Sequence, residues 1–302
     1  MQKIAFIGLG AMGGGMASNI ARKGIALTVY DIQAASVARV AEAGAMPAST
    51  LVEATKGADI VITMLPATQH VLEAVTGQGG VLDNMAPGGL LIDMSTIAPQ
   101  GTDTLIRICA ERNVRFIDAP VGRLASHAAA GKSMFMVGCD REEDFAQAKP
   151  LLDAMGDTII RCGKPGSGIR VKLVNNFQVL SIAEITAEAL VLAAKLGLDI
   201  NVVKEVNGQT TATNGQMQVN FATKSLVGDI EPGFTFDLSH KDMTLALEAA
   251  AQARLGLPVG AAVHAVYGAA RSGKYAGKDF SALLDYAADL AGIEPPRLKT
   301  SS

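Results

Sequence analysis

The chain has 302 residues and a formal net charge of −3, from 26 Lys and Arg residues against 29 Asp and Glu residues. This balance provides no basic surface of the kind that nucleic acids bind, so we expect no nucleic-acid partner. A hydrophobic fraction of 49% excludes a disordered chain, and the length predicts about two domains.

The first half of the chain alternates short apolar runs with helical patterns. The apolar runs are continuous, as in a parallel sheet that is covered on both faces. Strands are predicted at 3–7, 27–31, 60–64, 90–94, 115–118 and 133–137, and helices at 12–23, 33–43, 68–75 and 99–112. This alternation predicts an α/β domain with a Rossmann-like, doubly wound sheet.

The second half reads as helices only. A cluster of Gly, Pro and Ser at 163–168 precedes a long helical pattern at 169–196, which is apolar nearly all round over 183–194. Further helices are predicted at 200–208, 215–226, 237–254, 258–272 and 281–290. We therefore expect a first domain at 1–163 and an all-α second domain at 164–302, joined by the long helix.

Targeting and redox signals point to the cytoplasm. The apolar stretch at the N-terminus is too short for a signal peptide, and no continuous apolar run reaches the roughly 18 residues of a membrane span. The three cysteines are widely spaced and predict neither a disulfide framework nor a metal site. We expect a cytoplasmic protein with no membrane partner and no metal.

A glycine motif lies between the first predicted strand and helix. Gly8, Gly10 and Gly13 form G-x-G-x-x-G around Ala11 and Met12, in the strand-to-helix context that dinucleotide binding requires. These five residues are predicted to bind the pyrophosphate of the cofactor at the helix N-terminus. The alternative is a glycine-rich turn that binds nothing.

Asp31 ends the next predicted strand and suits the ribose hydroxyls of an adenosine. A carboxylate there repels a 2′-phosphate, and the following Ile32 and Gln33 supply no Arg to bind one. The predicted cofactor is therefore NAD, with NADH preferred over NADPH.

Several motifs in order give the chain a resemblance to a known family. They are F-I-G-L-G-A-M-G at 6–13, D-M-S-T at 93–96, D-A-P-V at 118–121, G-S-G at 166–168 with K-L-V-N-N at 172–176, and F-D-L-S-H-K-D at 236–242. Together they resemble the β-hydroxyacid dehydrogenase family, which contains 3-hydroxyisobutyrate and tartronate-semialdehyde dehydrogenases. The resemblance implies an NAD-dependent oxidoreductase that acts on small anionic aldehydes or alcohols, as a homodimer or homotetramer.

Lys172 is the candidate catalytic residue. Lys172 and Asn176 are four residues apart on the predicted helix and share a face, and Asn175 lies close by. Reduction of a carbonyl needs a proton donor beside the oxygen, and an ammonium group can supply that proton. The resemblance implies that Asn175 and Asn176 hold the substrate. The alternative is a surface lysine on a helix.

Residues at the predicted strand ends complete the expected cofactor and substrate contacts. Ser95 is predicted to bind substrate, and Thr96 the cofactor, because the carboxyl ends of parallel strands form the ligand crevice. A helix-capping role is the alternative for both. Leu65 and Pro66 end another strand and are predicted to pass over the cofactor. Lys241, in the last motif, is predicted to reach the nicotinamide end, or else to be a solvated lysine.

The chain departs from the family after D-A-P-V. The family continues with Ser-Gly-Gly, whereas this chain has Gly122, Arg123 and Leu124. The planar fork of Arg123 suits an oxyanion such as a sulfonate, which has one more oxygen than a carboxylate. Gly122 and Arg123 are therefore predicted substrate-binding residues. Three alternatives stay open: a structural role for Arg123, a carboxylate substrate such as succinic semialdehyde, and a non-catalytic dinucleotide-binding protein.

Overall fold

The structure is a computed structural model that describes residues 2–298. The chain divides into two compact units, Met1–Lys172 and Leu173–Ser302, and the long helix α9 (Ser167–Lys195) passes through the division.

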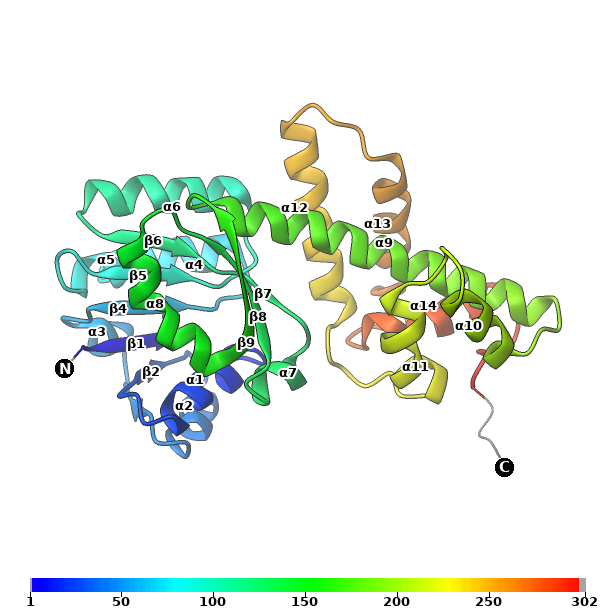
Figure 1. The fold of residues 1–302 in the computed structure, drawn as a ribbon, viewed down its shortest axis with the longest axis horizontal. Coiled ribbons are helices and arrows are strands. Elements are labelled where there is room, and N and C mark those ends of the chain that lie inside the picture. The colour runs from blue at the N-terminus through cyan, green and yellow to red at the C-terminus, as the bar shows by residue number, and fades with distance from the viewer. Residues whose placement is uncertain (1, 299–302) are drawn as a thin grey trace. The chain divides into compact units, whose positions relative to one another are not determined.

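Unit 1 contains one nine-stranded sheet (Figure 1). Its strands are β1 (Ile4–Ile7), β2 (Thr28–Tyr30), β3 (Met46–Pro47), β4 (Ile60–Thr63), β5 (Leu90–Asp93), β6 (Arg115–Asp118), β7 (Val121–Gly122), β8 (Ser133–Gly138) and β9 (Gly156–Gly163). The order is β3-β2-β1-β4-β5-β6-β8-β7, with β9 paired to β8. The pairs from β3 to β6 are parallel, and β8 is antiparallel to β6 and β7. This arrangement confirms the predicted Rossmann-like sheet.

Helices cover both faces of this sheet. In β1, Ile4 and Phe6 belong to one apolar cluster, with side chains from α1, α2 and α8. Ala5 and Ile7 belong to another cluster, on the opposite face, with side chains from α3, α4, α5 and α6. The helices of unit 1 are α1 (Gly13–Arg22), α2 (Ala34–Ala41), α3 (Leu51–Thr55), α4 (Thr68–Thr76), α5 (Val81–Asn84), α6 (Pro99–Glu111), α7 (Ala125–Ala129) and α8 (Glu142–Met155). Burial on both faces explains the continuous apolar runs.

The strand order places the strand-end candidate residues of unit 1 at one edge of the sheet. From β1 the chain adds β2 and β3 on one side, and then returns to add β4 on the other side of β1, to which it is parallel. In open α/β sheets, ligands bind at such a switch point, outside the carboxyl ends of the strands. The turns that follow β1, β2, β4, β5 and β6 all lie at this edge.

Some elements of unit 1 carry too weak a local signal to be predicted. β3 and β7 have only two residues each, and the residues of β9 are exposed or half-buried, so β9 has no continuous apolar run. β9 pairs parallel to β8 with register shifts at Ser133/Met134 and at Val137/Gly138. α8 contains Pro150, which interrupts the expected helical pattern.

Unit 2 is helical. Besides most of α9, it contains α10 (Ile200–Gly208), the π-helical turn η1 (Gln216–Asn220), α11 (Phe221–Thr223), the 3₁₀ turn η2 (Ser225–Val227), α12 (Phe236–Gln252), α13 (Pro258–Ala270), the 3₁₀ turn η3 (Phe280–Ala282) and α14 (Leu283–Leu290). One face of α9 packs into a core with Phe236 and Tyr267, through Leu180, Ala187 and Leu190. The all-α expectation for the second domain agrees with this architecture.

The membrane expectation needs a correction at α9. Of the described helices, α9 is the one that is long and apolar enough to span a membrane, with a mean hydropathy of 1.6 over its best window. Half of that window is buried inside the protein, as in the core helix of a soluble protein. Polar residues interrupt this stretch, so a search for continuous apolar runs does not find it; they are Gln178, Ser181, Glu184, Thr186 and Glu188.

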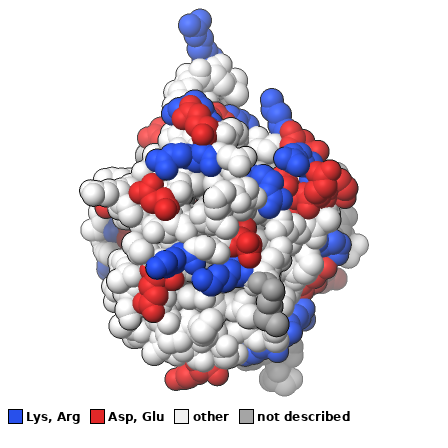
Figure 2. All heavy atoms as spheres, turned by 90° about the vertical axis from the view of Figure 1, so that its left-hand side faces the viewer, with Lys and Arg blue, Asp and Glu red and all other residues white. Residues whose placement is uncertain are grey.

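Charges are mixed on the face drawn in Figure 2. Lys and Arg side chains alternate there with Asp and Glu, and no patch of a single sign dominates that face. Exposed ion pairs such as Arg112–Asp83 join charges of opposite sign on the surface of unit 1.

The buried carboxyl of Glu184 makes the stability of unit 2 depend on pH. Burial, with a smaller contribution from Glu188, raises the pKa of Glu184 from 4.5 to about 7. The unfolded chain therefore loses this proton first as the pH rises. This group lowers the free energy of unfolding progressively between pH 4.5 and about 7, and the loss persists above that range.

We expect Glu184→Gln to raise Tm by a few degrees at about pH 8 and by less at about pH 5, because glutamine carries no charge to bury. Thermal unfolding of both proteins at the two pH values measures the difference, and Glu205→Gln, at an exposed site of α10, is the control. The same change in Tm at both pH values would contradict the assignment.

Candidate active site

The turn between β1 and α1 requires glycine at two positions. Gly8 has φ of +96°, and a Cβ there would overlap the carbonyl oxygen of Met64. A Cβ at Gly13 would overlap the carbonyl oxygen of Gly8. Gly10 differs, because a Cβ added there would meet no heavy atom within 4 Å. The turn is therefore tightly packed at Gly8 and Gly13, and the space beside Gly10 is open. The motif predicts that a pyrophosphate binds there.

Asp31 holds this turn in place. Its carboxylate accepts hydrogen bonds from the backbone N–H of Leu9 at 2.6 Å and of Gln33 at 2.7 Å. Both bonds fix the carboxylate at the end of β2, directly beside the glycine-rich turn. This is the position that a ribose-binding carboxylate needs.

A cavity of about 710 Å³ opens beside the turn. Gly10 and Ala11 line it together with Ser36 and Arg39 of α2. The residues around Asp31 and this open space fit an adenine dinucleotide. Met12 precedes α1, is half-buried, and packs against the core. Sequence reasoning missed Arg39, because no local motif places a residue of α2 against the turn.

The ends of β4 and β5 are tied together by hydrogen bonds. The N–H of Leu65 donates to Ser95 Oγ at 2.9 Å, and Thr63 Oγ1 donates to Asp93 Oδ1 at 2.8 Å. Burial raises the pKa of Asp93 to about 6, against hydrogen bonds from Ser95 and Thr63 that lower it. Ser95 is buried, and its hydroxyl oxygen accepts the hydrogen bond from Leu65. The exposed Pro66 follows Leu65, and the half-buried Thr96 follows Ser95.

A buried carboxylate fixes the start of α9. Asp118, at the end of β6, accepts hydrogen bonds from the N–H of Gly166 at 2.6 Å and of Ile169 at 2.7 Å. Burial raises the pKa of Asp118, and these two hydrogen bonds oppose the rise. Gly138 and Gly168 have no room for a Cβ beside this carboxylate. The first turn of α9 is therefore anchored to the carboxyl edge of the sheet.

Lys172 lies one turn further along α9 and contacts the short strand β7. Its Nζ donates a hydrogen bond to the carbonyl oxygen of Val121 at 2.8 Å. Gly122 follows Val121 in β7, and a Cβ there would press on Met134 Cε. The same two-residue strand thus holds the ammonium group and leads directly into Arg123.

Arg123 adopts an unusual backbone conformation. Its φ is +72°, in the left-handed region that favours glycine. The guanidinium donates to Asp157 Oδ1 at 2.7 Å, to Thr158 Oγ1 at 3.0 Å and to the carbonyl oxygen of Lys132 at 2.6 Å. None of these partners is a predicted site residue. A substrate anion would have to share this guanidinium with Asp157.

In unit 2, a buried carboxylate organises the remaining predicted residues. Asp242 accepts a hydrogen bond from Asn176 Nδ2 at 2.6 Å and forms an ion pair with Lys241 Nζ at 3.0 Å. Asn175 Nδ2 lies 3.3 Å from Asn176 Oδ1. Asp242 thereby sets the orientation of the Asn176 amide and connects α9 with α12, which carries the last motif.

The predicted residues therefore fall into local groups. Hydrogen bonds connect Asp31 with the glycine-rich turn and Leu65 with Ser95. In unit 2, Asn175 contacts Asn176, and Asp242 connects Asn176 with Lys241. Sequence reasoning missed the organising carboxylates Asp118 and Asp242 as site residues, although both belong to quoted motifs. Their long-range partners could not be identified from spacing alone.

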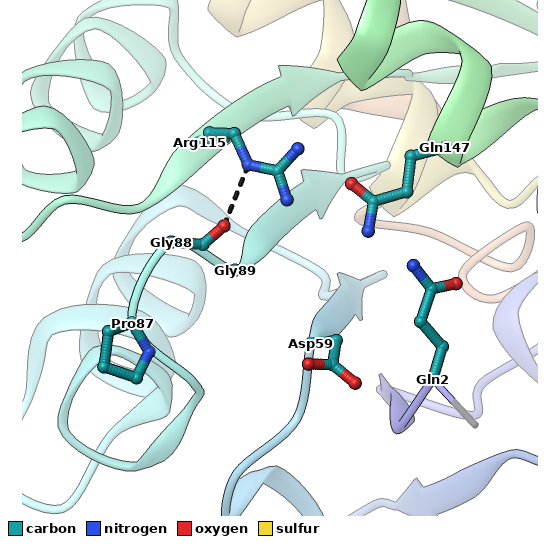
Figure 3. A pocket seen from close by; sticks show the side chains of 7 residues that line it. All are labelled: Gln2, Asp59, Pro87, Gly88, Gly89, Arg115 and Gln147. Carbon is teal, nitrogen blue, oxygen red and sulfur yellow. Dashed lines mark hydrogen bonds between the residues drawn. The ribbon is translucent and has the colours of Figure 1, made fainter.

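A second cavity, of about 330 Å³, lies away from these residues (Figure 3). Its lining comes from the segments that precede β1, β4 and β5, and from Arg115 at the start of β6. Arg115 Nε donates to the carbonyl oxygen of Gly88 at 2.9 Å. These are the amino ends of parallel strands, opposite to the ligand edge, so this cavity does not belong to the candidate active site.

Comparison with known proteins gives consistent matches along the chain. Residues 3–163 match the family model of the NAD binding domain of 6-phosphogluconate dehydrogenase. Residues 166–287 match the model described as the NAD-binding part of NADP-dependent 3-hydroxyisobutyrate dehydrogenase. A 3-sulfolactaldehyde reductase from Escherichia coli (strain K12) is 40% identical over 293 residues, which cover 97% of this chain and 98% of that protein.

Two further relatives carry other names. An NAD-dependent L-serine dehydrogenase from Pseudomonas aeruginosa is 38% identical over 93% of this chain and 96% of its own length. The solved structure of Mycobacterium tuberculosis 3-hydroxyisobutyrate dehydrogenase with L-serine superposes with a TM-score of 0.86 at 32% identity, covering 95% of this chain and 99% of that chain.

We expect Asp118→Ala to destabilise the protein by about 1–3 kcal/mol, because two buried N–H groups at the start of α9 lose their acceptor. Chemical denaturation measures the change. The control is Asp103→Asn, which removes an exposed ion pair between α6 and Arg170 of α9. This variant should change the stability by less than about 1 kcal/mol. Equal effects of the two variants would show that Asp118 does not anchor the helix.

Proposed function

This chain belongs to the β-hydroxyacid dehydrogenase family of NAD-dependent oxidoreductases, the group of 3-hydroxyisobutyrate dehydrogenase, and on that premise we propose that it reduces 3-sulfolactaldehyde with NADH. The product is 2,3-dihydroxypropane-1-sulfonate, as in sulfoglycolysis. The 40% identity to a 3-sulfolactaldehyde reductase supports this substrate. The observation that carries the proposal is the strained Arg123 directly after the strand that holds Lys172.

Lys172 is the general acid in this proposal. When bound, the nicotinamide cofactor supplies the hydride that adds to the aldehyde carbon. The Lys172 ammonium donates its proton to the aldehyde oxygen as the C–O double bond opens, and the alcohol forms. The neutral amine then takes up a proton from water. The Val121 carbonyl orients the ammonium, so little reorganisation is needed at the moment of proton transfer.

Arg123 is the proposed anchor for the sulfonate. A non-glycine residue in the left-handed region costs about 1–2 kcal/mol, so a chain that keeps arginine there gains something from its side chain. The exposed ion pair with Asp157 contributes little to that gain, and the hydrogen bonds to Thr158 and to the Lys132 carbonyl contribute a further part. We propose that a bound sulfonate supplies the rest. Gly122, Ser95, Asn175 and Asn176 are the other proposed substrate contacts.

NADH is the proposed cofactor because Asp31 presents a carboxylate beside the glycine-rich turn. Gly8, Gly10, Ala11, Met12 and Gly13 would receive the pyrophosphate. Leu65, Pro66, Thr96 and Lys241 are the proposed contacts toward the nicotinamide end.

We also propose a homodimer or homotetramer in the cytoplasm. Apolar residues on one side of α9 support an oligomer, because Val174, Ile185 and Leu192 are 64%, 56% and 59% exposed. An apolar row of this kind on a helix is typical of a subunit interface.

The second candidate substrate is a carboxylate semialdehyde such as succinic semialdehyde. Two observations favour it: Asp157 already neutralises part of the Arg123 charge, and the serine and 3-hydroxyisobutyrate dehydrogenases are similar along nearly the whole chain. A candidate of another class is a non-catalytic dinucleotide-binding protein, which would have no use for Lys172.

We expect Lys172→Ala to lower kcat for aldehyde reduction by about 10²–10⁴-fold, because the proton donor is lost. NADH binding, followed by fluorescence, should change by less than about threefold, since the lysine is not a proposed cofactor contact. Undiminished turnover by this variant would contradict the mechanism and would leave the non-catalytic candidate open.

We expect Arg123→Ser to lower kcat/KM for 3-sulfolactaldehyde by about ten- to a hundredfold, the value of a lost charge-assisted hydrogen bond. KM for NADH should change little. Arg161→Ser, which removes an exposed arginine of β9, is the matched control. Equal losses of sulfonate turnover and cofactor affinity would contradict the assigned role.

A further inference from the structure

Asp157 and Thr158, at the start of β9, hold the end of the Arg123 guanidinium. Nη1 of Arg123 donates to the carbonyl oxygen of Lys132 at 2.6 Å and to Asp157 Oδ1 at 2.7 Å, which uses both of its hydrogens. Nη2 donates to Thr158 Oγ1 at 3.0 Å, and this hydroxyl donates to the same Asp157 oxygen at 2.8 Å. Asp157 and Thr158 are thus hydrogen-bonded to each other and to the guanidinium.

The other edge of the guanidinium is open. A guanidinium has five N–H donors, and these bonds leave Nε–H and one Nη2–H of Arg123 without a hydrogen-bond partner among residues 2–298. Because Asp157 and Thr158 take the outer hydrogens of Nη1 and Nη2, the two remaining donors lie side by side. Two parallel N–H groups match two oxygens of one oxyanion. An anion can therefore bind this edge while Asp157 stays in place.

Asp157 adds a fixed negative charge beside this open edge. The hydrogen bond from Thr158 lowers the pKa of Asp157, and Arg123 and the charge of Lys132 lower it further, so the carboxylate is ionised at neutral pH. An incoming anion thus meets a guanidinium whose charge is already partly neutralised. The side chains of Arg123 and Asp157 are 33% and 47% exposed, so water and salt weaken this effect without removing it.

We propose that Asp157 is a specificity-determining residue, which restricts the Arg123 site to singly charged oxyanions and disfavours doubly charged phosphates. The inference rests on the proposed role of Arg123 as the substrate anchor, and it applies to a sulfonate and to a carboxylate alike. A phosphate ester is close to doubly charged at about pH 7.5, because its second pKa is about 6. The Asp157 carboxylate repels this second charge. A three-carbon phosphate resembles a three-carbon sulfonate in shape, so charge is the property that separates them.

The competing role for Asp157 is structural support of Arg123 in its left-handed conformation. Loss of that support would weaken the binding of every anion in the same proportion, because it acts through the position of the guanidinium. A charge effect changes the binding of a doubly charged anion more than that of a singly charged one. The two roles therefore differ in a ratio of affinities.

The test measures inhibition of NADH-dependent aldehyde reduction by 2,3-dihydroxypropane-1-sulfonate and by glycerol 3-phosphate, at about pH 7.5 and low salt. The assay uses 3-sulfolactaldehyde or succinic semialdehyde, whichever the wild type reduces better. We expect the wild type to bind the sulfonate more tightly. Asp157→Asn keeps an oxygen for Arg123 but removes the charge, and should shift the ratio of inhibition constants toward the phosphate by about two- to fivefold.

Two changes of condition separate charge from structure. The shift caused by Asp157→Asn should shrink at about 0.5 M salt, where exposed charges are screened. It should also shrink at about pH 5.5, where the phosphate ester is mostly singly charged. Asp157→Glu, which keeps the charge, should retain the wild-type ratio.

Glu142→Gln is the matched control, because it removes the carboxylate of another exposed ion pair, with Arg161 of the same strand β9. It should leave the ratio unchanged. An equal change of both inhibition constants in Asp157→Asn would overturn the inference in favour of structural support, and would leave the proposed function intact. A wild type that reduces neither aldehyde would overturn the proposed function, and this inference with it.

Discussion

The contact between Asp118 and the first turn of α9 determines where Lys172, the proposed proton donor, lies. Asp118 ends β6, the last strand of the parallel run from β3 to β6, and its carboxylate accepts the N–H groups of Gly166 and Ile169. From this fixed point one helical turn leads to Lys172, whose ammonium reaches the carbonyl of Val121. The D-A-P-V and G-S-G motifs are therefore two halves of one joint between sheet and helix. The strand that receives Lys172 also positions Arg123, so the proposed acid and the proposed anion anchor are held by the same strand.

The same device recurs through the site. Asp31, Asp93 and Asp118 each end a parallel strand, and each accepts backbone N–H groups from a neighbouring turn. Asp242 plays the corresponding part in unit 2 by holding the amide of Asn176. Burying a carboxylate is costly unless its oxygens have polar partners. Each of these four carboxylates accepts at least one hydrogen bond, and Asp242 Oδ1 pairs with Lys241. Within each unit, the carboxylates hold a local frame for the proposed hydride transfer, which needs a narrow range of geometries.

Local signals were sufficient to predict most elements but few of the contacts. Continuous apolar runs and glycine turns identify the parallel strands, because burial on both faces of the sheet favours an apolar side chain at every position. β9 has no such run, since much of it is exposed. Arg123 meets Asp157 across 34 residues and Asn176 meets Asp242 across 66, and such contacts follow only from the folded topology. Spacing could place Lys172 and Asn176 on one helix face, but it could not reveal which carboxylates hold them.

The central claim is that this frame serves the reduction of a sulfonate-bearing aldehyde. Its most direct test follows NADH oxidation at 340 nm by the wild-type protein, with 3-sulfolactaldehyde and succinic semialdehyde compared at equal concentrations. The account predicts a kcat/KM for the sulfonate that is higher by at least about tenfold, since an extra charge-assisted hydrogen bond at Arg123 is worth about that factor. A preference for succinic semialdehyde would contradict the sulfonate assignment and would make Arg123 a carboxylate anchor.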